Sequence, residues 1–273
     1  MTRSNTVISV FIPLNNGVAS EMTVTQHTVL HRLTYSNATA QILLLDLTTD
    51  LSRSFQGNGD VNVAKTAAGT RITGGGEFLP SFGEGNYKVF FCFDAPAFTE
   101  AVFYQPSPLT SVSFQTINGT AFNSTVTQAG SGVIMKFAPP ANGVLNVRVG
   151  ISWTSAAKAC SFAQAEIPNL GAFDAVKAAA RLVFTFCFGI KLKPNLSRAK
   201  WNDVLGTIAI NTNGVASDVQ EIFWSSLYRA HISPTNITGD NPLWVSNEPF
   251  YDSFYCIWYV SILQLYPKIL IPP

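Results

Sequence analysis

The sequence VLNVRVGISWTSAAKACSFAQAE (residues 144–166) changes its hydrophobic period part-way along, and this change decides the fold class. Up to Trp153, apolar and polar residues alternate, so that Val147, Val149 and Ile151 would lie on one face of a strand. Beyond Trp153 the spacing becomes helical. We therefore expect a mainly β chain up to this point, followed by α structure.

On the N-terminal side, short alternating segments recur between turn-like sequences. Glycine-rich runs separate them, and we interpret Gly74–Gly76 as a loop, because no phosphate-binding pattern or following helix accompanies these glycines. No alternation of strands with helices is visible, so the pattern predicts a sandwich of two antiparallel sheets. The candidate strands are Val7–Pro13, Glu21–Tyr35, Ala40–Leu47, Tyr87–Phe93, Ala101–Gln105, Ser111–Ile117, Gly132–Ala138 and Val144–Trp153.

On the C-terminal side, helix signals replace the alternation. Thr154 or Ser155 can cap a helix over Ala156–Glu166. Pro168 would stop this helix, and the Ala-rich segment Phe173–Arg181 is compatible with a second one.

The clearest helix begins at Ser217 and ends near His231. Gln220 stands at the third position after Ser217, which predicts a capping box. An apolar stripe then follows at helical spacing, formed by Val219, Ile222, Phe223 and Leu227.

Composition restricts the partners. Hydrophobic residues make up 47% of the 273 residues and charged residues only 12%, with a net charge of +1. Neither sign is clustered, which argues against nucleic acid and favours a neutral ligand or a protein surface. The longest apolar run, Leu182–Ile190, is about half the ~18–20 residues that a membrane-spanning helix needs. No secretory signal pattern follows Met1.

One feature nevertheless suggests the secretory pathway, a set of glycosylation sequons, Asn37-Ala-Thr, Asn118-Gly-Thr, Asn123-Ser-Thr, Asn195-Leu-Ser and Asn236-Ile-Thr. The four cysteines, Cys92, Cys160, Cys187 and Cys256, are widely spaced and form no CxxC pair, which disfavours zinc. Both disulfides and small buried apolar residues fit this spacing, and the two interpretations stay open.

The N-terminal part offers little catalytic chemistry. His27 and His31 are four residues apart, but their surroundings are β-rich and no carboxylate completes a metal cluster. We interpret them as strand-surface histidines. No G-x-S-x-G elbow supports esterase chemistry.

The densest polar and aromatic sequence runs from Asn241 to Trp258. It contains Trp244, Glu248 and Asp252 as well as Trp258 itself. Aromatic faces stack on the apolar face of a pyranose, and carboxylates accept hydrogen bonds from its hydroxyls. Taken alone, these rings fit the packing of a helical core better, so a sugar site and a core both remain interpretations.

Several stretches in succession resemble the fungal branch of glycoside hydrolase family 92. The resemblance covers most of residues 8–181 and 200–258, and the longest match is Asn241 to Trp258. The other stretches are Arg71–Gly83, Tyr87–Cys92, Arg148–Ser152, Ala159-Cys160, Ala165–Pro168 and Phe223–Arg229.

This resemblance implies a β-sandwich packed against an (α/α)6 barrel, with the active site between them and a calcium ion bound to substrate. It implies an exo-acting α-mannosidase that removes terminal mannose, for example α-1,2-linked, from N-glycans or mannans with inversion. Inversion requires two carboxyl groups ~6.5–9.5 Å apart. In the family the acid, the base and the calcium ligands lie mainly further along the barrel, so we assign no catalytic residue and no metal ligand here. By motif position, Trp244, Glu248, Asp252 and Trp258 would contact the sugar.

The domain organisation expected from the resemblance has three parts. Residues 1–155 form the sandwich, and the chain begins part-way through this domain. Residues 156–215 form a helical connection, and residues 216–273 begin the catalytic domain. We expect this chain alone to be inactive and poorly soluble, and its full-length parent to be secreted.

Two segments depart from the family. Residues 182–197 interrupt a helix that should continue directly into a segment like Trp201–Leu205. Tyr259 follows Trp258 where the family has aspartate, and residues 259–273 no longer resemble the expected helix. We hypothesise that both segments are translated intron sequence, and a spliced transcript that contains them would contradict this.

Two other readings compete with the enzyme. A non-catalytic, lectin-like sandwich would bind mannose without any downstream barrel. A capsid-like or adhesion sandwich fits the composition rich in Ser, Thr and Asn but leaves the sequence from Asn241 to Trp258 unexplained.

Overall fold

The computed structural model describes residues 9–13, 17–35, 41–49, 54–66, 69–80, 85–107, 111–139, 142–181, 205–231 and 235–252. Two compact units follow one another along the chain, Met1–Ala180 and Arg181–Pro273. No helix within the described ranges is long and apolar enough to cross a membrane.

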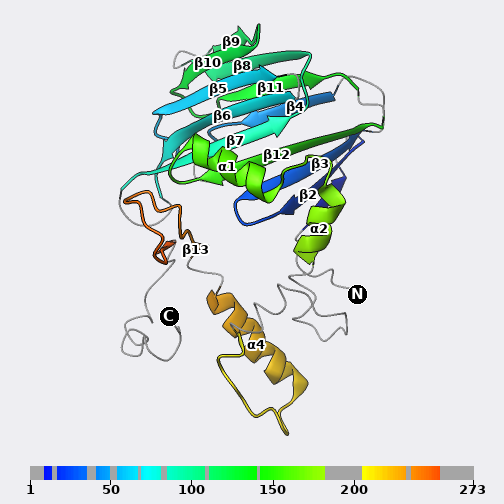
Figure 1. Ribbon diagram of the computed structural model, residues 1–273, viewed down its shortest axis with the longest axis vertical. Helices are drawn as coiled ribbons and strands as arrows, with labels where there is room; N and C mark the ends of the chain where they lie inside the picture. Colours follow the sequence, from blue (N-terminus) through cyan, green and yellow to red (C-terminus); the bar gives the residue numbers. More distant parts are fainter. Residues whose placement is uncertain are drawn as a thin grey trace. The chain divides into compact units, whose positions relative to one another are not determined.

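The first unit is a sandwich of two antiparallel sheets (Figure 1). Its strands are β1 (Ser9–Pro13), β2 (Val18–Val24), β3 (Thr28–Tyr35), β4 (Gln41–Asp46), β5 (Gly59–Thr66), β6 (Gly69–Phe78), β7 (Tyr87–Ala95), β8 (Glu100–Pro106), β9 (Val112–Thr116), β10 (Ala121–Val126), β11 (Gly132–Phe137) and β12 (Val144–Ser152). Among the described residues, one sheet has the order β1-β2-β3-β12-β7-β6-β5-β10 and the other has the order β4-β11-β8-β9. The predicted antiparallel sandwich is confirmed.

The core lies between the two sheets, and β12 is central in the larger one. Val149 lies opposite Val29 of β3 on one side and Phe93 of β7 on the other. The expected shared face is confirmed, because Val147 is buried in the core and Val149 packs against it. Ile151 lies near the end of the strand, where it is 43% exposed.

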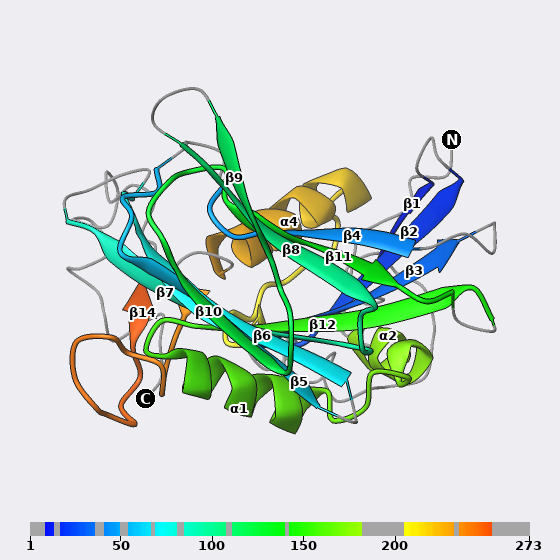
Figure 2. The same cartoon turned by 90° about the horizontal axis from the view of Figure 1, so that it is seen from above.

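Two helices pack on the outer face of the larger sheet, α1 (Ala156–Glu166) and α2 (Phe173–Arg181) (Figure 2). Both helices were expected at these positions. The side chain of Ser155 caps α1 by accepting a hydrogen bond from the backbone N–H of Lys158 at 3.1 Å. Strand structure therefore ends and helical structure begins at the period change in the sequence.

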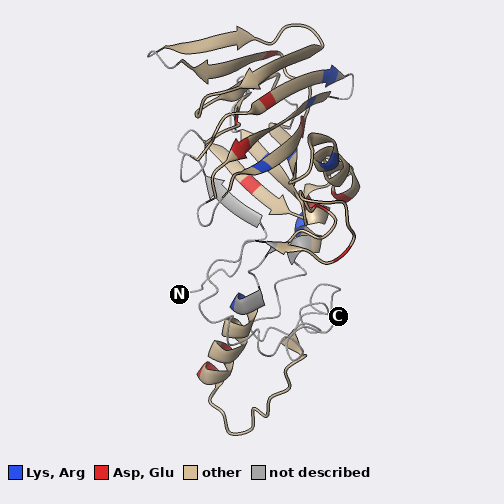
Figure 3. Ribbon diagram, turned by 90° about the vertical axis from the view of Figure 1, so that its left-hand side faces the viewer, with Lys and Arg blue, Asp and Glu red and all other residues tan. Residues whose placement is uncertain are grey.

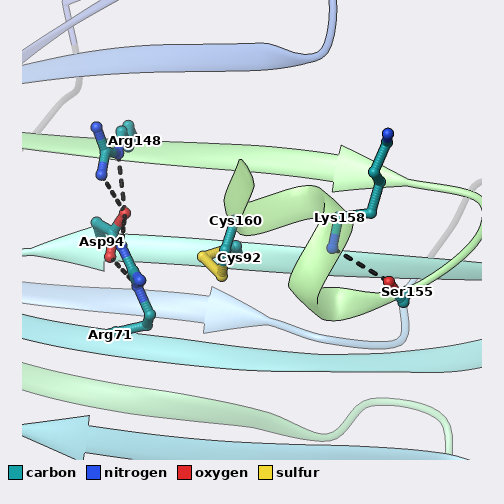
Figure 4. Close-up of a disulfide and its surroundings, with 7 residues drawn as sticks. All are labelled: Arg71, Cys92, Asp94, Arg148, Ser155, Lys158 and Cys160. Atoms are coloured by element: carbon teal, nitrogen blue, oxygen red, sulfur yellow. Dashed lines mark hydrogen bonds and ion pairs between the residues drawn. A yellow bond between two sulfur atoms is a disulfide. The ribbon is translucent and has the colours of Figure 1, made fainter. Parts of the chain in front are cut away.

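Glycine 150 of β12 lets α1 lie close to the sheet. A Cβ atom at Gly150 would stand 2.5 Å from the carbonyl oxygen of Ala159 and 2.9 Å from the Cβ of Ala163. Cys92 lies opposite Gly150 in β7 and forms a disulfide with Cys160 of α1 (Figure 4). The disulfide interpretation therefore holds for this pair, whereas Cys187 and Cys256 lie outside the described residues.

Two expectations about strands are wrong. Gly74–Gly76 do not form a loop but lie inside β6, where neighbouring groups leave no room for side chains. The single strand expected over Glu21–Tyr35 is a hairpin of β2 and β3, because the chain turns between Thr25 and Thr28, with Thr25 N donating to Thr28 O at 2.8 Å. β5 and β10 were not among the strands predicted from the sequence.

The second unit contains α4 (Ser217–His231), β13 (Thr235–Asn236) and β14 (Tyr251–Asp252). The expected start and end of α4 are confirmed, but the capping box is wrong. The Gln220 side chain donates to the carbonyl oxygen of Val215 at 2.8 Å instead of accepting from Ser217. Val219 and Ile222 of the apolar stripe are exposed, and residues 182–197 and 259–273 lie outside the described residues.

Candidate functional site

The loop that carries most of the predicted sugar-binding residues is closed at its base by two short strands. β13 and β14 pair antiparallel, so that Thr235 lies opposite Asp252 and Asn236 lies opposite Tyr251. Next to this pair, Ile237 N donates to the carbonyl oxygen of Phe250 at 2.9 Å. The chain between the strands is therefore held as one closed loop, residues 235–252.

The first part of the loop is buried and rigidly turned. Asp240 N donates to the Ile237 carbonyl oxygen at 2.9 Å, and Gly239 between them has a positive φ of 80°. The Asn241 side-chain oxygen accepts from Leu243 N at 2.9 Å, which is an Asx turn. Ile237, Asp240 and Asn241 are all buried, so this segment anchors the exposed part of the loop that follows.

The second part of the loop presents an aromatic ring and a carboxylate to solvent. Trp244 is 55% exposed, and its ring meets that of Phe250 nearly perpendicularly, with centroids 5.7 Å apart. Glu248 is also exposed, and its backbone N–H donates to Ser246 Oγ at 3.0 Å. Phe250 thus supports one part of the Trp244 ring and leaves the rest accessible to a ligand.

The structure brings three of the four predicted residues into this loop. Trp244 and Glu248 lie on its exposed part, and Asp252 lies in β14 at its base. Trp258 lies outside the described residues. Within the part of the chain that the structure describes, no hydrogen bond joins Trp244 to Glu248. The exposed part of the loop therefore offers a stacking surface, Trp244, and a hydrogen-bond acceptor, Glu248.

A buried charge cluster on the first unit was not anticipated from the sequence. Asp94 of β7 accepts from Arg71 Nε at 2.7 Å and from Arg148 Nη2 at 2.7 Å (Figure 4). Arg148 also donates to the backbone carbonyl of Ile167, just beyond α1. The cluster ties β6, β7 and β12 to the segment that links the two helices, and its role is structural. The signals in the sequence are Arg148 and Asp94, each a charged residue next to apolar residues of its strand.

A second polar cluster joins the β2–β3 turn to the end of α1. Glu166 accepts from the backbone N–H of His27 at 2.9 Å, contacts His27 Nδ1 at 2.6 Å and accepts from the Thr25 hydroxyl. Burial would raise the pKa of Glu166, but the hydrogen bonds from Thr25 and His27 outweigh it and hold the pKa below its usual value. The His27 ring stacks on Phe162, with centroids 3.8 Å apart.

The two histidines singled out in the sequence do not come together. His27 is not a strand residue, because it lies in the turn and packs against α1 on the outer side of the sheet. His31 lies in β3 on the side of Leu33, facing the inner side, and burial lowers its pKa. They therefore cannot share a metal ion. No group of three or more His, Cys, Asp or Glu side chains that could hold a metal occurs among the described residues.

An open hollow of about 200 Å³ lies on the inner face of the larger sheet. Leu47, Gly76, Phe91 and Ile151 contribute to its lining, which is apolar apart from Asp46. Asp46 alone among the lining residues is acidic or basic, so the hollow has no pair of acid and base groups with which to perform hydrolysis. Elsewhere, basic and acidic residues are interspersed over the strands and helices drawn in Figure 3.

Comparisons with known proteins identify both halves of the chain. Residues 11–152 match the model of the glycosyl hydrolase family 92 N-terminal domain, and residues 193–264 match that of the family 92 catalytic domain. The chain is 35% identical over 258 residues to an uncharacterized secreted glycosidase of Arthroderma benhamiae, an alignment that covers 90% of this chain and 30% of that protein.

Solved structures show the same fold. One is a GH92 family glycosyl hydrolase, with a TM-score of 0.63 and 21% identity over 89% of this chain and 29% of that one. Another is a family GH92 α-mannosidase from Bacteroides thetaiotaomicron, with a TM-score of 0.60 and 18% identity over 89% of this chain and 30% of that one. At these identities the likeness concerns the fold. The chain spans less than a third of the length of each of these relatives.

Proposed function

This chain belongs to glycosyl hydrolase family 92, and we propose that it forms part of a calcium-dependent, exo-acting α-mannosidase. The observation that carries the proposal is the ordered match of both family domains within one chain, the N-terminal domain over residues 11–152 and the catalytic domain over residues 193–264. The mannosidases among its structural neighbours support the substrate class.

The proposed reaction removes terminal α-linked mannose, for example α-1,2-linked, from N-glycans or mannans with inversion at the anomeric carbon. Inversion uses one carboxylic acid to protonate the leaving oxygen and one carboxylate to activate water, ~6.5–9.5 Å apart. We assign neither role to a residue of this chain, and we expect the chain alone not to hydrolyse mannosides. Its domains would follow the expected division into residues 1–155, 156–215 and 216–273.

The chain's own proposed contribution to the site is the loop of residues 235–252. The accessible part of the Trp244 ring would stack on the apolar face of the sugar, and Glu248 would accept hydrogen bonds from its hydroxyls. Asp252 and Trp258 follow in the same motif and are proposed to contact the same subsite. The support for this is the exposure of Trp244 and Glu248 on a loop with a buried anchor.

The family implies a calcium ion, and the described residues do not provide a site for it. They contain no cluster of three or more potential ligand side chains. Calcium takes six to eight oxygen ligands, so a single carboxylate such as Glu248 is insufficient. We therefore assign no calcium ligand and derive no step through the ion.

We propose that the full-length parent passes through the secretory pathway. The disulfide between Cys92 and Cys160 supports this, because such bonds form and persist in oxidising compartments. The relative from Arthroderma benhamiae is described as a secreted glycosidase, which supports the same conclusion.

The test is hydrolysis of α-1,2-mannobiose by the full-length parent with calcium, with the product followed by proton NMR. Release of β-mannose as the first anomer is expected, since inversion converts an α-linkage into a β-product. Release of α-mannose would contradict the inverting mechanism. Mannose binding by a folded protein that hydrolyses no mannoside would favour the non-catalytic lectin instead.

A further inference from the structure

The free edges of the two sheets meet at one flank of the sandwich. Among the described residues, β9 pairs only with β8 at the end of the smaller sheet, and β10 pairs only with β5 at the end of the larger one. A short connection over residues 117–120 joins β9 to β10 (Figure 1). Within the described ranges, the outer side of this flank, the β9–β10 edge, therefore pairs with no further strand.

The β9–β10 edge is exposed and partly apolar. Every residue of β9 is exposed, including Phe114 at 65% and Val112 at 47%. An exposed strand with apolar side chains is a template for pairing with another chain, and natural proteins blunt such edges with charge, proline, bulges or a covering segment. β9 (VSFQT) contains neither a charged residue nor a proline. The sequence of β9 therefore carries none of the charged or proline residues that usually protect such an edge.

Two glycosylation sequons lie on the β9–β10 edge. Asn118 begins Asn118-Gly-Thr in the connection, directly after the buried Ile117, and it is exposed. Asn123 begins Asn123-Ser-Thr in β10 and is also exposed. Phe122 and Val126 of β10 pack into the core, so Asn123 lies on the opposite, outer face of the sheet. Both asparagines can therefore carry a bulky group without disturbing the core.

The disulfide between Cys92 and Cys160 is an independent sign that the chain meets the compartment in which N-glycans are attached. The third sequon within the described residues, which begins at Asn236, differs because its side chains already have hydrogen-bond partners. Asn236 Oδ1 accepts from Thr238 N, and the Thr238 hydroxyl accepts from Phe250 N at 3.0 Å, so both side chains already stabilise the base of the loop. Asn37 and Asn195 lie outside the described residues.

We infer that Asn118 and Asn123 carry N-linked glycans, and that these glycans cover the β9–β10 edge and prevent edge-to-edge association. The inference rests on the secretory localisation proposed above and is independent of α-mannosidase activity. Hydrated glycans are bulky and solubilising, so they would supply the protection that the sequence of β9 lacks.

Occupancy is tested by secreting the full-length parent from a eukaryotic host behind a cleavable leader. Peptide N-glycosidase F should lower the mass of the product and convert Asn118 and Asn123 to aspartate in the peptide map. Thr120→Ala and Thr125→Ala should each remove one glycan while leaving the asparagine in place. Thr120→Ser is the matched control, because it keeps the sequon and should keep the glycan. Unmodified Asn118 and Asn123 in a secreted product that contains the Cys92–Cys160 disulfide would overturn the inference.

The protective role is tested by sedimentation velocity on the same products. The Thr120→Ala/Thr125→Ala double variant should self-associate with rising concentration, and adding Phe114→Lys should reverse this, because charge on an edge strand blocks pairing. Formation of the Cys92–Cys160 disulfide checks that each variant is folded. An unchanged sedimentation coefficient in a folded double variant without glycans would overturn the role of the glycans at this edge.

Discussion

At the scale of single residues, Asp94 helps to hold the segment after α1 against the larger sheet, through Arg148. It neutralises two guanidinium groups at once, and Arg148 in turn holds the Ile167 carbonyl beyond α1. Asp94 and Arg148 are both buried. Removing the partner of a buried charge lowers the free energy of unfolding far more than removing the partner of an exposed charge. The buried charge is left without either water or a counter-ion.

Asp94→Asn should therefore lower the free energy of unfolding by about 3–5 kcal/mol, the range for breaking a buried ion pair. Urea denaturation followed by tryptophan fluorescence measures this. Glu100→Gln is the matched control, since Glu100 forms an ion pair with Lys136 on the exposed surface, and it should cost at most about 1 kcal/mol. Equal effects of the two substitutions would contradict the role assigned to Asp94.

Glu166 should give the fold a pH dependence. Its pKa is lowered in the folded protein from the ordinary 4.5, so its contribution to stability is present above about pH 4.5 and is lost as the pH falls through the lower folded value. Wild type should thus be more stable than Glu166→Gln near neutral pH, and the two should converge in acid. Urea titrations between pH 7 and pH 3 measure the difference. A gap that does not narrow in acid would show that the charge of Glu166 is not responsible.

What the sequence could not predict at this scale is long-range pairing. Cys92 and Cys160 are separated by 68 residues, and Thr25 and Glu166 by 141. Alternation and spacing describe neighbours within an element, so they left the cysteines with two interpretations and gave no partner for His27.

At the scale of elements, the glycines of β6 show why a prediction from neighbouring residues alone can be wrong. Gly74–Gly76 look like a loop because glycine is common in turns. In β6, however, a Cβ atom at Gly74 would stand 2.1 Å from the Asp60 carbonyl oxygen, and one at Gly76 would stand 2.7 Å from the ring of Phe55. These glycines are required by the groups packed against the strand, which are distant in sequence. The cap of α1 could be narrowed to Thr154 or Ser155 because it depends only on residues close in sequence, and the structure assigns it to Ser155.

Gly150→Ala tests how closely α1 packs on β12. The added methyl group would stand 2.5 Å from the Ala159 carbonyl oxygen, so the helix must move. We expect a loss of about 1–3 kcal/mol in the free energy of unfolding, as for other overpacked sites. Gly171→Ala is the control, because its nearest neighbour is the side chain of Asn169 at 3.3 Å, and it should cost less. A smaller loss for Gly150→Ala than for Gly171→Ala would contradict the packing described.

At the scale of the whole molecule, the order of structure follows from the single change of period after Trp153. β12 ends at Ser152 and α1 begins at Ala156, so the expected order of β then α is confirmed. The proposed sugar site could be predicted only in part from patterns in the sequence. The motif named Trp244 and Glu248, but closure of their loop depends on two-residue strands that no periodicity reveals.

Trp244→Ala in the full-length parent should lower kcat/KM for mannobiose about 2- to 13-fold, which corresponds to the ~0.5–1.5 kcal/mol of an aromatic stacking contact. Val245→Ala, at a fully exposed neighbour in the same loop, should leave kcat/KM unchanged. Steady-state kinetics on both variants provide the comparison. A Trp244 variant with wild-type kinetics would remove this residue from the proposed sugar subsite.

The most direct test of the central claim compares mannose release by two proteins, each with calcium and α-1,2-mannobiose. One is the chain of 273 residues, and the other is its full-length parent without residues 182–197 and 259–273. We predict release by the parent and none by the shorter chain, because the proposed acid and base are not among its residues. Release of mannose by the shorter chain would contradict the account of where catalysis lies.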